Sequence, residues 1–128
     1  MEILNIYQHY EEEKHRAKEY YKRLGRIWCP GLNDYVVFNS VGFRHLMRKG
    51  GTWRSKDEQM RRFDLLPYAQ KIITDPKAVF ITEKRTLSPL TSEAEFFACT
   101  NQIDGQQITV IIRQINMRQK HFFSIFAK

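Results

Sequence analysis

Apolar and polar residues alternate with two different periods along the chain. Up to Pro76 the apolar residues recur at helical spacing, and beyond it they recur at every second position, as in strands. The first stretch, from about Glu2 to Leu24, predicts a long amphipathic helix with an aromatic stripe facing the core and a solvated charged face. The residues of this stripe are Ile3, Ile6, Tyr7, Tyr10, Ala17, Tyr20, Tyr21 and Leu24.

Two more helices and one short strand are expected before Pro76. The apolar run at residues 35–38 favours a strand, and Ser40 can cap a short helix over residues 41–48. Gly25 and the turn at residues 29–31 separate this strand from the first helix, and Gly50-Gly51 predicts a loop. The order Ser-Lys-Asp-Glu from residue 55 matches a capping box, so the third helix should begin at Lys56. Pro67 should kink or restart it before residue 75.

The second half of the chain predicts a sheet. Asp104-Gly105 is a strong hairpin signal, and the other connections are short, which favours an antiparallel meander. We therefore expect an α+β fold, with N-terminal helices packed on a C-terminal four-stranded antiparallel sheet. The chain is read as a single domain, residues 1–128, with its long helix at about 2–24 and a core at about 35–127. The four strands are expected at residues 78–86, 93–101, 106–115 and 120–127.

Composition supports a globular domain of 128 residues, with 42% hydrophobic and 13% aromatic residues. No apolar run approaches the roughly 20 residues of a membrane span, and the first residues lack the order of a signal peptide. We therefore expect a cytoplasmic protein with no membrane partner. Cys29 and Cys99 lie far apart and outside any metal-ligand spacing, so free thiols are expected, with no metal site and no cofactor.

The charge of the chain points to a polyanionic partner. Lys and Arg number 21 against 14 Asp and Glu, for a net charge of +7. The window from Arg44 to Arg62 holds seven basic residues against two acidic ones, and no acidic residue follows Asp104. A fold that joins these two segments would form one basic patch, although a solvated surface remains the ordinary explanation for any single charge.

His45 is the first candidate for chemistry, because it lies among Arg44, Arg48 and Lys49. A group that titrates near neutrality beside phosphate-binding charges is what metal-free cleavage of a phosphodiester needs. The cations should also lower the pKa of His45 and keep its imidazole neutral. The alternative is a helix histidine that only packs and forms hydrogen bonds.

Arg113 and Ser124 are the candidates on the strands. Arg113 interrupts an apolar strand, so it either pairs with Glu83, Glu93 or Glu95 or clamps a phosphate. Ser124 either bonds the backbone or binds a phosphate oxygen. Strand alternation puts Ser124 on the same face as Phe126, and puts Phe123 and His121, a weaker candidate for the acid, on the opposite face.

Two segments resemble the nucleases grouped with barnase, EndoU, colicin D and RelE, and most closely their phage-type branch (PBECR). They are residues 39–45 and residues 111–115 with 120–126, and the resemblance covers the chain from Tyr35 to the end. It implies helices followed by a four-stranded antiparallel sheet and metal-independent RNA cleavage. His45 matches a helix histidine that follows a lysine-rich run in colicin D, with Arg44 alone before it here. Ser124 matches a strand serine, and Phe126 stands where the colicin has tryptophan.

These observations lead to one expected function and two rivals. The expected function is a metal-independent endoribonuclease in which the 2′-hydroxyl attacks the adjacent phosphate, toxin-like and with transfer RNA as one candidate substrate. The first rival is a non-catalytic RNA-binding module on the same basic face. The second rival is a toxin–antitoxin or phage-defence component, which shares the nuclease chemistry and has its basic surface covered by an acidic inhibitor or antitoxin protein. A metal-dependent nuclease is disfavoured, because no paired carboxylates of the Asp-x-Asp or Glu-x-Lys kind occur in a predicted strand, and Glu93 and Glu95 are only the nearest approach to such a pair. His45, Arg113 and Ser124 are the expected catalytic residues, and the expected RNA contacts are Arg44, Arg48, Lys49, Arg54, Lys120, His121 and Phe126.

Overall fold

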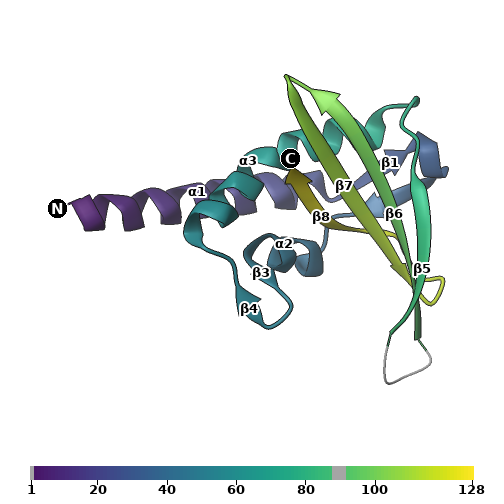
Figure 1. Cartoon of the computed structure of the whole chain (residues 1–128), viewed down its shortest axis with the longest axis horizontal. Helices are drawn as coiled ribbons and strands as arrows, with labels where there is room; N and C mark the ends of the chain where they lie inside the picture. Colours follow the sequence, from purple (N-terminus) through teal and green to yellow (C-terminus); the bar gives the residue numbers. More distant parts are fainter. Residues whose placement is uncertain (1, 88–91) are drawn as a thin grey trace.

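The computed structural model describes residues 2–87 and 92–128, with side chains described from residue 7 onward (Figure 1). The described chain forms three α-helices, a mixed sheet of six strands and a small separate hairpin. The helices are α1 (Glu2–Leu24), α2 (Ser40–Met47) and α3 (Lys56–Thr74), and a 3-10 turn, η1, spans Pro30–Leu32. The strands are β1 (Arg26–Cys29), β2 (Asp34–Val37), β3 (Arg48–Lys49), β4 (Thr52–Trp53), β5 (Ile81–Leu87), β6 (Ser92–Ile103), β7 (Gln106–Ile115) and β8 (His121–Ala127).

The large sheet has the order β1-β2-β8-β7-β6-β5. Strands β5 to β8 form an antiparallel meander, and the turn between β6 and β7 uses Asp104 and Gly105, both with positive φ. The α+β class is confirmed, but the expected four-stranded antiparallel sheet is wrong. β2 pairs with β8 in parallel at Val37 and His121, and β1 extends the sheet beyond β2. β1 was not expected, because four residues are too few to show a period, whereas the turn expected at residues 29–31 agrees with η1.

The helix ends agree only partly with the sequence signals. Ser55 caps α3 as expected, since its hydroxyl accepts a hydrogen bond from the Glu58 backbone. The cap of α2 is Asn39 and not Ser40, because the Asn39 carboxamide oxygen accepts from the backbones of Val41 and Gly42. Helix α3 continues through the exposed Pro67 as one element, so of the two expected outcomes, a kink or a restart, the restart is wrong.

The segment between α2 and α3 is more ordered than expected. Instead of a loop, β3 and β4 pair as an antiparallel hairpin around Gly50 and Gly51. Gly50 has a φ of 62°, a conformation that suits glycine in a two-residue turn. This hairpin carries Trp53 and leads directly into Arg54 and the start of α3.

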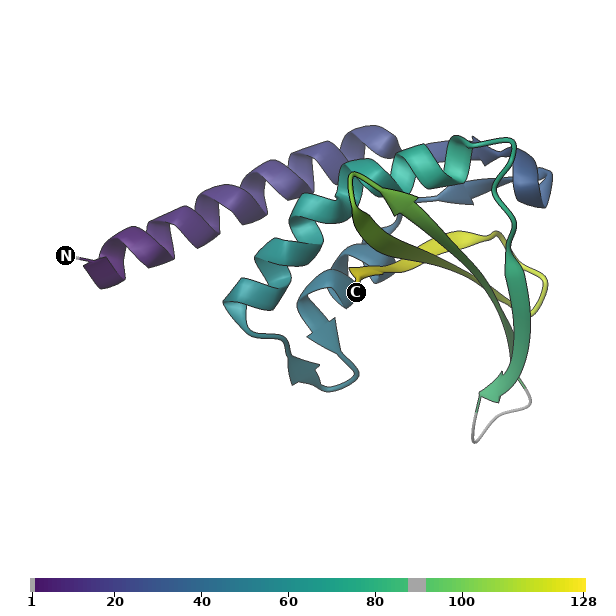
Figure 2. The same ribbon diagram turned by 45° about the horizontal axis from the view of Figure 1, so that its top comes forward.

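One face of the sheet is covered by helices and forms the core. Helix α3 packs on this face and α1 packs against α3, and the first turns of α1 extend beyond the rest of the molecule (Figure 2). From the stripe of α1, Tyr10, Ala17 and Tyr21 are buried, whereas Tyr7 is 53% exposed and the side chains of Ile3 and Ile6 lie outside the described residues. None of the helices in the described ranges combines the length and the apolar character needed to cross a membrane. The strand residues of the core include Phe97, Cys99, Val110, Ile112, Phe122 and Ile125.

Helix α2 lies along β8 with close contact between their backbones. Gly42 makes this possible, because a side chain there would collide with the carbonyl oxygen of Phe122 and the hydroxyl of Tyr21. That hydroxyl is itself fixed by a 2.6 Å hydrogen bond to the Asn39 carbonyl. Two apolar residues that follow Gly42 on α2, Phe43 and Leu46, are buried.

A β-bulge in β8 decides which of its residues share a face. Ser124 is opposite Ile111 while Phe122 is opposite Ile112, so Phe123 is an extra residue in the strand. Phe122 and Ile125 therefore both enter the core. His121 and Ser124 share the opposite face with Arg113, since His121 is in register with Arg113. The expectation that His121 points away from Ser124 is wrong, because it assumed unbroken alternation.

We expect Gly42→Ala to destabilise the fold. In an exposed helix the change would be favourable, but here the methyl group meets a backbone carbonyl, and overpacking of this kind costs about 1–3 kcal/mol. Urea unfolding followed by circular dichroism measures the change. Gly51→Ala is the matched control, because a Cβ added at Gly51 would meet no atom within 4 Å. Equal stabilities of the two variants would contradict the close contact of α2 with β8.

Candidate functional site

The sheet face opposite the helices, called the outer face below, brings two of the expected catalytic residues together. The His45 ring lies 4.2 Å from the Phe123 ring, measured between centroids. The central carbon of the Arg113 guanidinium lies 4.4 Å from the centroid of the same ring. Helix α2 supplies the first group and β7 the second, and the bulge in β8 places the aromatic ring between them.

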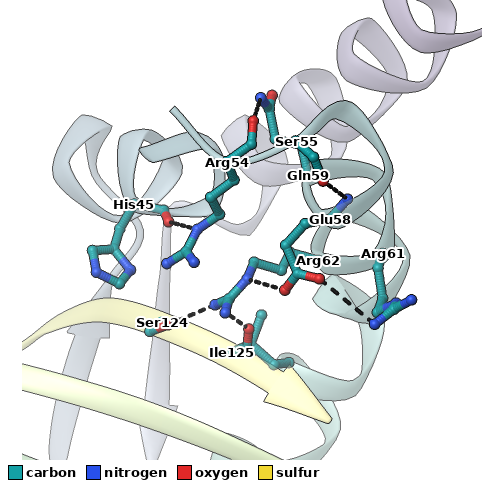
Figure 3. A network of polar contacts seen from close by, with 9 residues as sticks. All are labelled: His45, Arg54, Ser55, Glu58, Gln59, Arg61, Arg62, Ser124 and Ile125. Atoms are coloured by element: carbon teal, nitrogen blue, oxygen red, sulfur yellow. Dashed lines mark hydrogen bonds and ion pairs between the residues drawn. The ribbon is translucent and has the colours of Figure 1, made fainter. Parts of the chain in front are cut away.

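Ser124 joins this group through Arg62 of α3. One guanidinium nitrogen of Arg62, Nη1, donates to the Ser124 hydroxyl at 3.2 Å and to the Ile125 carbonyl at 3.0 Å (Figure 3). The Nε of Arg62 donates to Glu58 at 3.0 Å, an i, i+4 pair on α3. Arg62 therefore links α3 to the edge of β8 that is left free by the short β2.

Arg54 holds the backbone of His45 in place by hydrogen bonds. Its Nε donates to the His45 carbonyl at 3.1 Å, and its backbone N–H donates to the Met47 carbonyl at 2.9 Å. The carbonyl of Arg54 accepts a 2.8 Å hydrogen bond from the buried Gln59 side chain, which is in turn bonded by the Tyr10 hydroxyl. A chain of hydrogen bonds thus runs from α1 through α3 to the backbone of His45.

These surroundings keep the His45 imidazole neutral. Burial, and then the positive charges of Arg54, Arg62, Arg113 and Lys49, lower the pKa of His45 to about 4. The expected direction of the pKa shift is confirmed, but burial is the larger cause, and of the three cations expected to act only Lys49 contributes. Its Nδ1 atom is buried and has no hydrogen-bond partner among the described residues. At neutral pH this ring can therefore accept a proton.

Arg113 forms none of the three ion pairs weighed from the sequence. Glu83 pairs instead with Arg85 at 3.1 Å. Glu93 and Glu95 belong to the other face of β6, since they alternate with Phe96, the residue in register with Arg113.

His121 takes the place of a carboxylate partner. The Nε of Arg113 donates to Nε2 of His121 at 3.0 Å. Because this nitrogen accepts a hydrogen bond, His121 is a neutral imidazole. Burial and the Arg113 charge lower the pKa of His121.

Two adjacent phenylalanine rings on the outer face lie between cationic or imidazole groups. The Arg85 guanidinium lies 4.9 Å from the Phe96 ring, and the Phe96 and Phe123 rings are 5.6 Å apart. Arg113 and His45 lie on the far side of this row, against Phe123. Such cation–π contacts hold the guanidinium groups in place. Arg85 also donates two hydrogen bonds to Glu83, whereas Arg113 has no carboxylate partner among the described residues.

Some of the expected RNA contacts lie near His45 or on the outer face, and the others lie elsewhere. Lys49 and Arg54 act on His45 electrostatically, and Phe126 shares the outer face with Ser124. Arg44 and Arg48 instead line a hollow beside α1. Lys120 lies elsewhere too, because its ammonium group pairs with Asp34 at 2.9 Å and lies over Phe97 of the core face.

Three residues of the site were not recognised from the sequence as functional. Arg62 was counted only as part of the basic window, although its i, i+4 spacing from Glu58 is a local signal. Phe123 was assigned to the other face, and no local pattern marks the bulge that moves it. Phe96 looks like any aromatic residue of a core strand, and its neighbour Phe97 is indeed buried.

Among the side chains described from residue 7 onward, no three His, Cys, Asp or Glu groups lie together as a metal site would require. Comparisons of the chain with protein-family models, with curated proteins and with solved structures find no match. The resemblance to the barnase, EndoU, colicin D and RelE nucleases therefore stays a prediction.

We expect the His45 ring to titrate near pH 4, and Arg54→Gln to raise this midpoint toward the ordinary 6.5. Arg54 is the largest charge acting on the ring, so its removal matters most after burial. NMR titration of the ring resonances measures the effect. Arg61→Gln is the control, because Arg61 is exposed, pairs with Glu58 and is not among the groups that shift the pKa of His45.

The same shift gives stability a pH dependence. The unfolded chain protonates His45 below about pH 6.5, whereas the folded chain does so only near pH 4. Protons therefore favour the unfolded state, and the contribution of His45 to stability falls as the pH drops from 6.5 to 4. A titration midpoint of the His45 ring near pH 6.5 in the wild type would contradict a buried imidazole surrounded by cations.

Proposed function

We propose that this chain is a metal-independent endoribonuclease. The observation that supports it most is the meeting of a neutral His45 imidazole and the Arg113 guanidinium over the Phe123 ring. A proton acceptor and a fixed cation side by side are the two elements that cleavage of RNA requires, because RNA carries its own nucleophile.

In the proposed reaction, His45 takes the proton of a 2′-hydroxyl through Nε2, since its Nδ1 is buried. The 2′-oxygen attacks the adjacent phosphorus, and negative charge builds up on the non-bridging oxygens. Arg113 and Arg54 stabilise this charge. The 5′-oxygen leaves with a proton returned by His45 or by water, and the products carry a 2′,3′-cyclic phosphate and a 5′-hydroxyl.

His121 and Ser124 act as positioning residues in this scheme. His121 is 7% exposed and holds Nε of Arg113, which leaves the terminal nitrogens of Arg113 for a phosphate. Ser124 is 3% exposed and holds Arg62. This burial favours a role in orienting Arg62 over the direct phosphate contact expected from the sequence.

One observation favours the first rival, a non-catalytic RNA-binding module. His121, the weaker candidate for the acid, is committed to Arg113, so His45 would have to return the proton itself or leave this to water. A module that only binds RNA needs the cations and aromatic rings but no acid. An acidic inhibitor or antitoxin on the same face stays a prediction that the same cations support.

We expect the purified chain to cleave total RNA in EDTA, and His45→Ala to abolish cleavage while RNA binding is kept. Denaturing gels and analysis of the cyclic phosphate ends measure the reaction. The rate constant kcat/KM should rise through about pH 4 and stay level to neutrality, because the base acts when unprotonated. His15→Ala on the exposed side of α1 is the control. Binding without cleavage by the wild type would favour the module.

We also expect Arg113→Gln to lower kcat by about 10²–10³-fold, the usual loss when one group that stabilises an oxyanion is removed. Single-turnover kinetics on a short RNA measure it. Arg85→Gln is the matched control, since Arg85 also lies against a phenylalanine of the outer face but farther from His45. Equal losses in the two variants would point to general attraction of RNA and would contradict a special role for Arg113.

A further inference from the structure

A hollow of about 460 Å³ lies between α1, α2 and the β3–β4 hairpin, and the proposed reaction does not use it. Its residues come from a different side of α2 than His45. The apolar part of the lining is Tyr21, Phe38, Phe43, Met47 and Trp53, and the polar part is Lys18, Lys22, Asn39, Ser40, Arg44 and Arg48.

The charge and lining of the hollow suit an anionic ligand that also has an apolar or aromatic part. Four of its side chains are cationic and none is acidic. Its size falls in the range of small-molecule sites, about 300–1,000 Å³. A nucleotide combines an aromatic base with a phosphate and matches both parts of the lining.

Trp53 is the residue best suited to contact a base. It is 59% exposed on a two-residue strand and is the cross-strand partner of Arg48, so one side of its ring is covered and the rest is open to solvent. Arg48 lies 4.8 Å from its ring and is tied to the Gly51 carbonyl at 3.1 Å, so the indole is held in place on one side. The Nε of Arg48 is buried with no partner among the described residues.

We propose that this hollow binds one nucleotide of an RNA strand, with the base against Trp53 and the phosphate among Lys18, Lys22 and Arg44. The inference deepens the proposed function and rests on it for the source of the nucleotide. Trp53 also lines the next hollow, with Lys49, Arg54 and the acidic Glu58. Lys49 and Arg54 are two of the cations that lower the pKa of His45, so the hairpin connects the hollow with the surroundings of His45. A free mononucleotide has the same chemistry, and the experiment separates the two sources.

The test is the binding of a short single-stranded 2′-O-methyl RNA, which cannot be cleaved. Trp53→Ala should weaken binding by roughly 5-fold to 100-fold, the range for loss of one base–aromatic stack. Trp28→Ala is the matched control, because Trp28 is the other tryptophan of the chain and is 44% exposed. Trp28 belongs to the edge strand β1, and its ring lies against Tyr35 of β2. In a Trp28→Phe protein the RNA should quench the fluorescence of Trp53.

A second pair of variants separates a built site from general attraction. Arg44→Glu should weaken binding more than Lys71→Glu, which makes the same change in charge at the exposed end of α3. Equal effects within both pairs would overturn the proposal. Binding of polyglutamate that depends on Arg44 but not on Trp53, with no Trp53 effect on RNA, would also overturn it and point to an acidic protein partner.

The outcome is independent of catalysis. If the wild type cleaves no RNA but Trp53→Ala still weakens binding, the proposed function fails and the nucleotide site stands. If His45→Ala stops cleavage while Trp53→Ala and Trp28→Ala bind RNA equally, the site fails and the proposed function stands. Competition by 5′-AMP would assign the hollow to a free nucleotide as well, and failure of 5′-AMP to compete would assign it to a strand alone.

Discussion

The extra residue in β8 is the constraint on which the outer face depends. In a regular strand His121 and Ser124 would lie on opposite faces, and Phe123 would share a face with one of its buried neighbours. The bulge instead gives Phe122 and Ile125 to the core and leaves the Phe123 ring under His45 and Arg113. A bulge also interrupts the ladder of backbone hydrogen bonds, and part of this loss is offset where Arg62 donates to the Ile125 carbonyl.

The charges of this face are held in ways that leave them available. Arg113 is bonded to a neutral imidazole, and Arg54 to a backbone carbonyl, so neither guanidinium is neutralised by the group that orients it. Bringing cations together around a half-buried ring costs free energy, as the low pKa of His45 reflects. The apolar core on the opposite face of β6, β7 and β8 provides burial that offsets this cost. An anion on the outer face would relieve the repulsion, which is the physical reason for expecting one there.

The parts of the fold that local signals determine were predictable from the sequence. The bounds of β7, the start of α3 at Lys56 and the turn at Asp104 and Gly105 depend on neighbours in the chain, and all three agree with the structure. The parallel pairing of β2 with β8 and the bulge depend on distant residues, and no local pattern shows them. The site follows the same division. His45 and Arg113 stood out by residue type and setting, whereas the pairing of Lys120 with Asp34 could be seen only in three dimensions.

The hydrogen-bonded chain from Tyr10 to Gln59, Arg54 and the backbone of His45 has a consequence for how variants are interpreted. Removing the Tyr10 hydroxyl would leave an amide oxygen of Gln59 unpaired in a buried position, where such a loss is costly. The displacement would reach the segment that carries the imidazole, although Tyr10 belongs to α1 and His45 to α2. Impaired function after a change in α1 is therefore no sign that α1 touches a ligand, because remote damage and direct contact produce the same symptom.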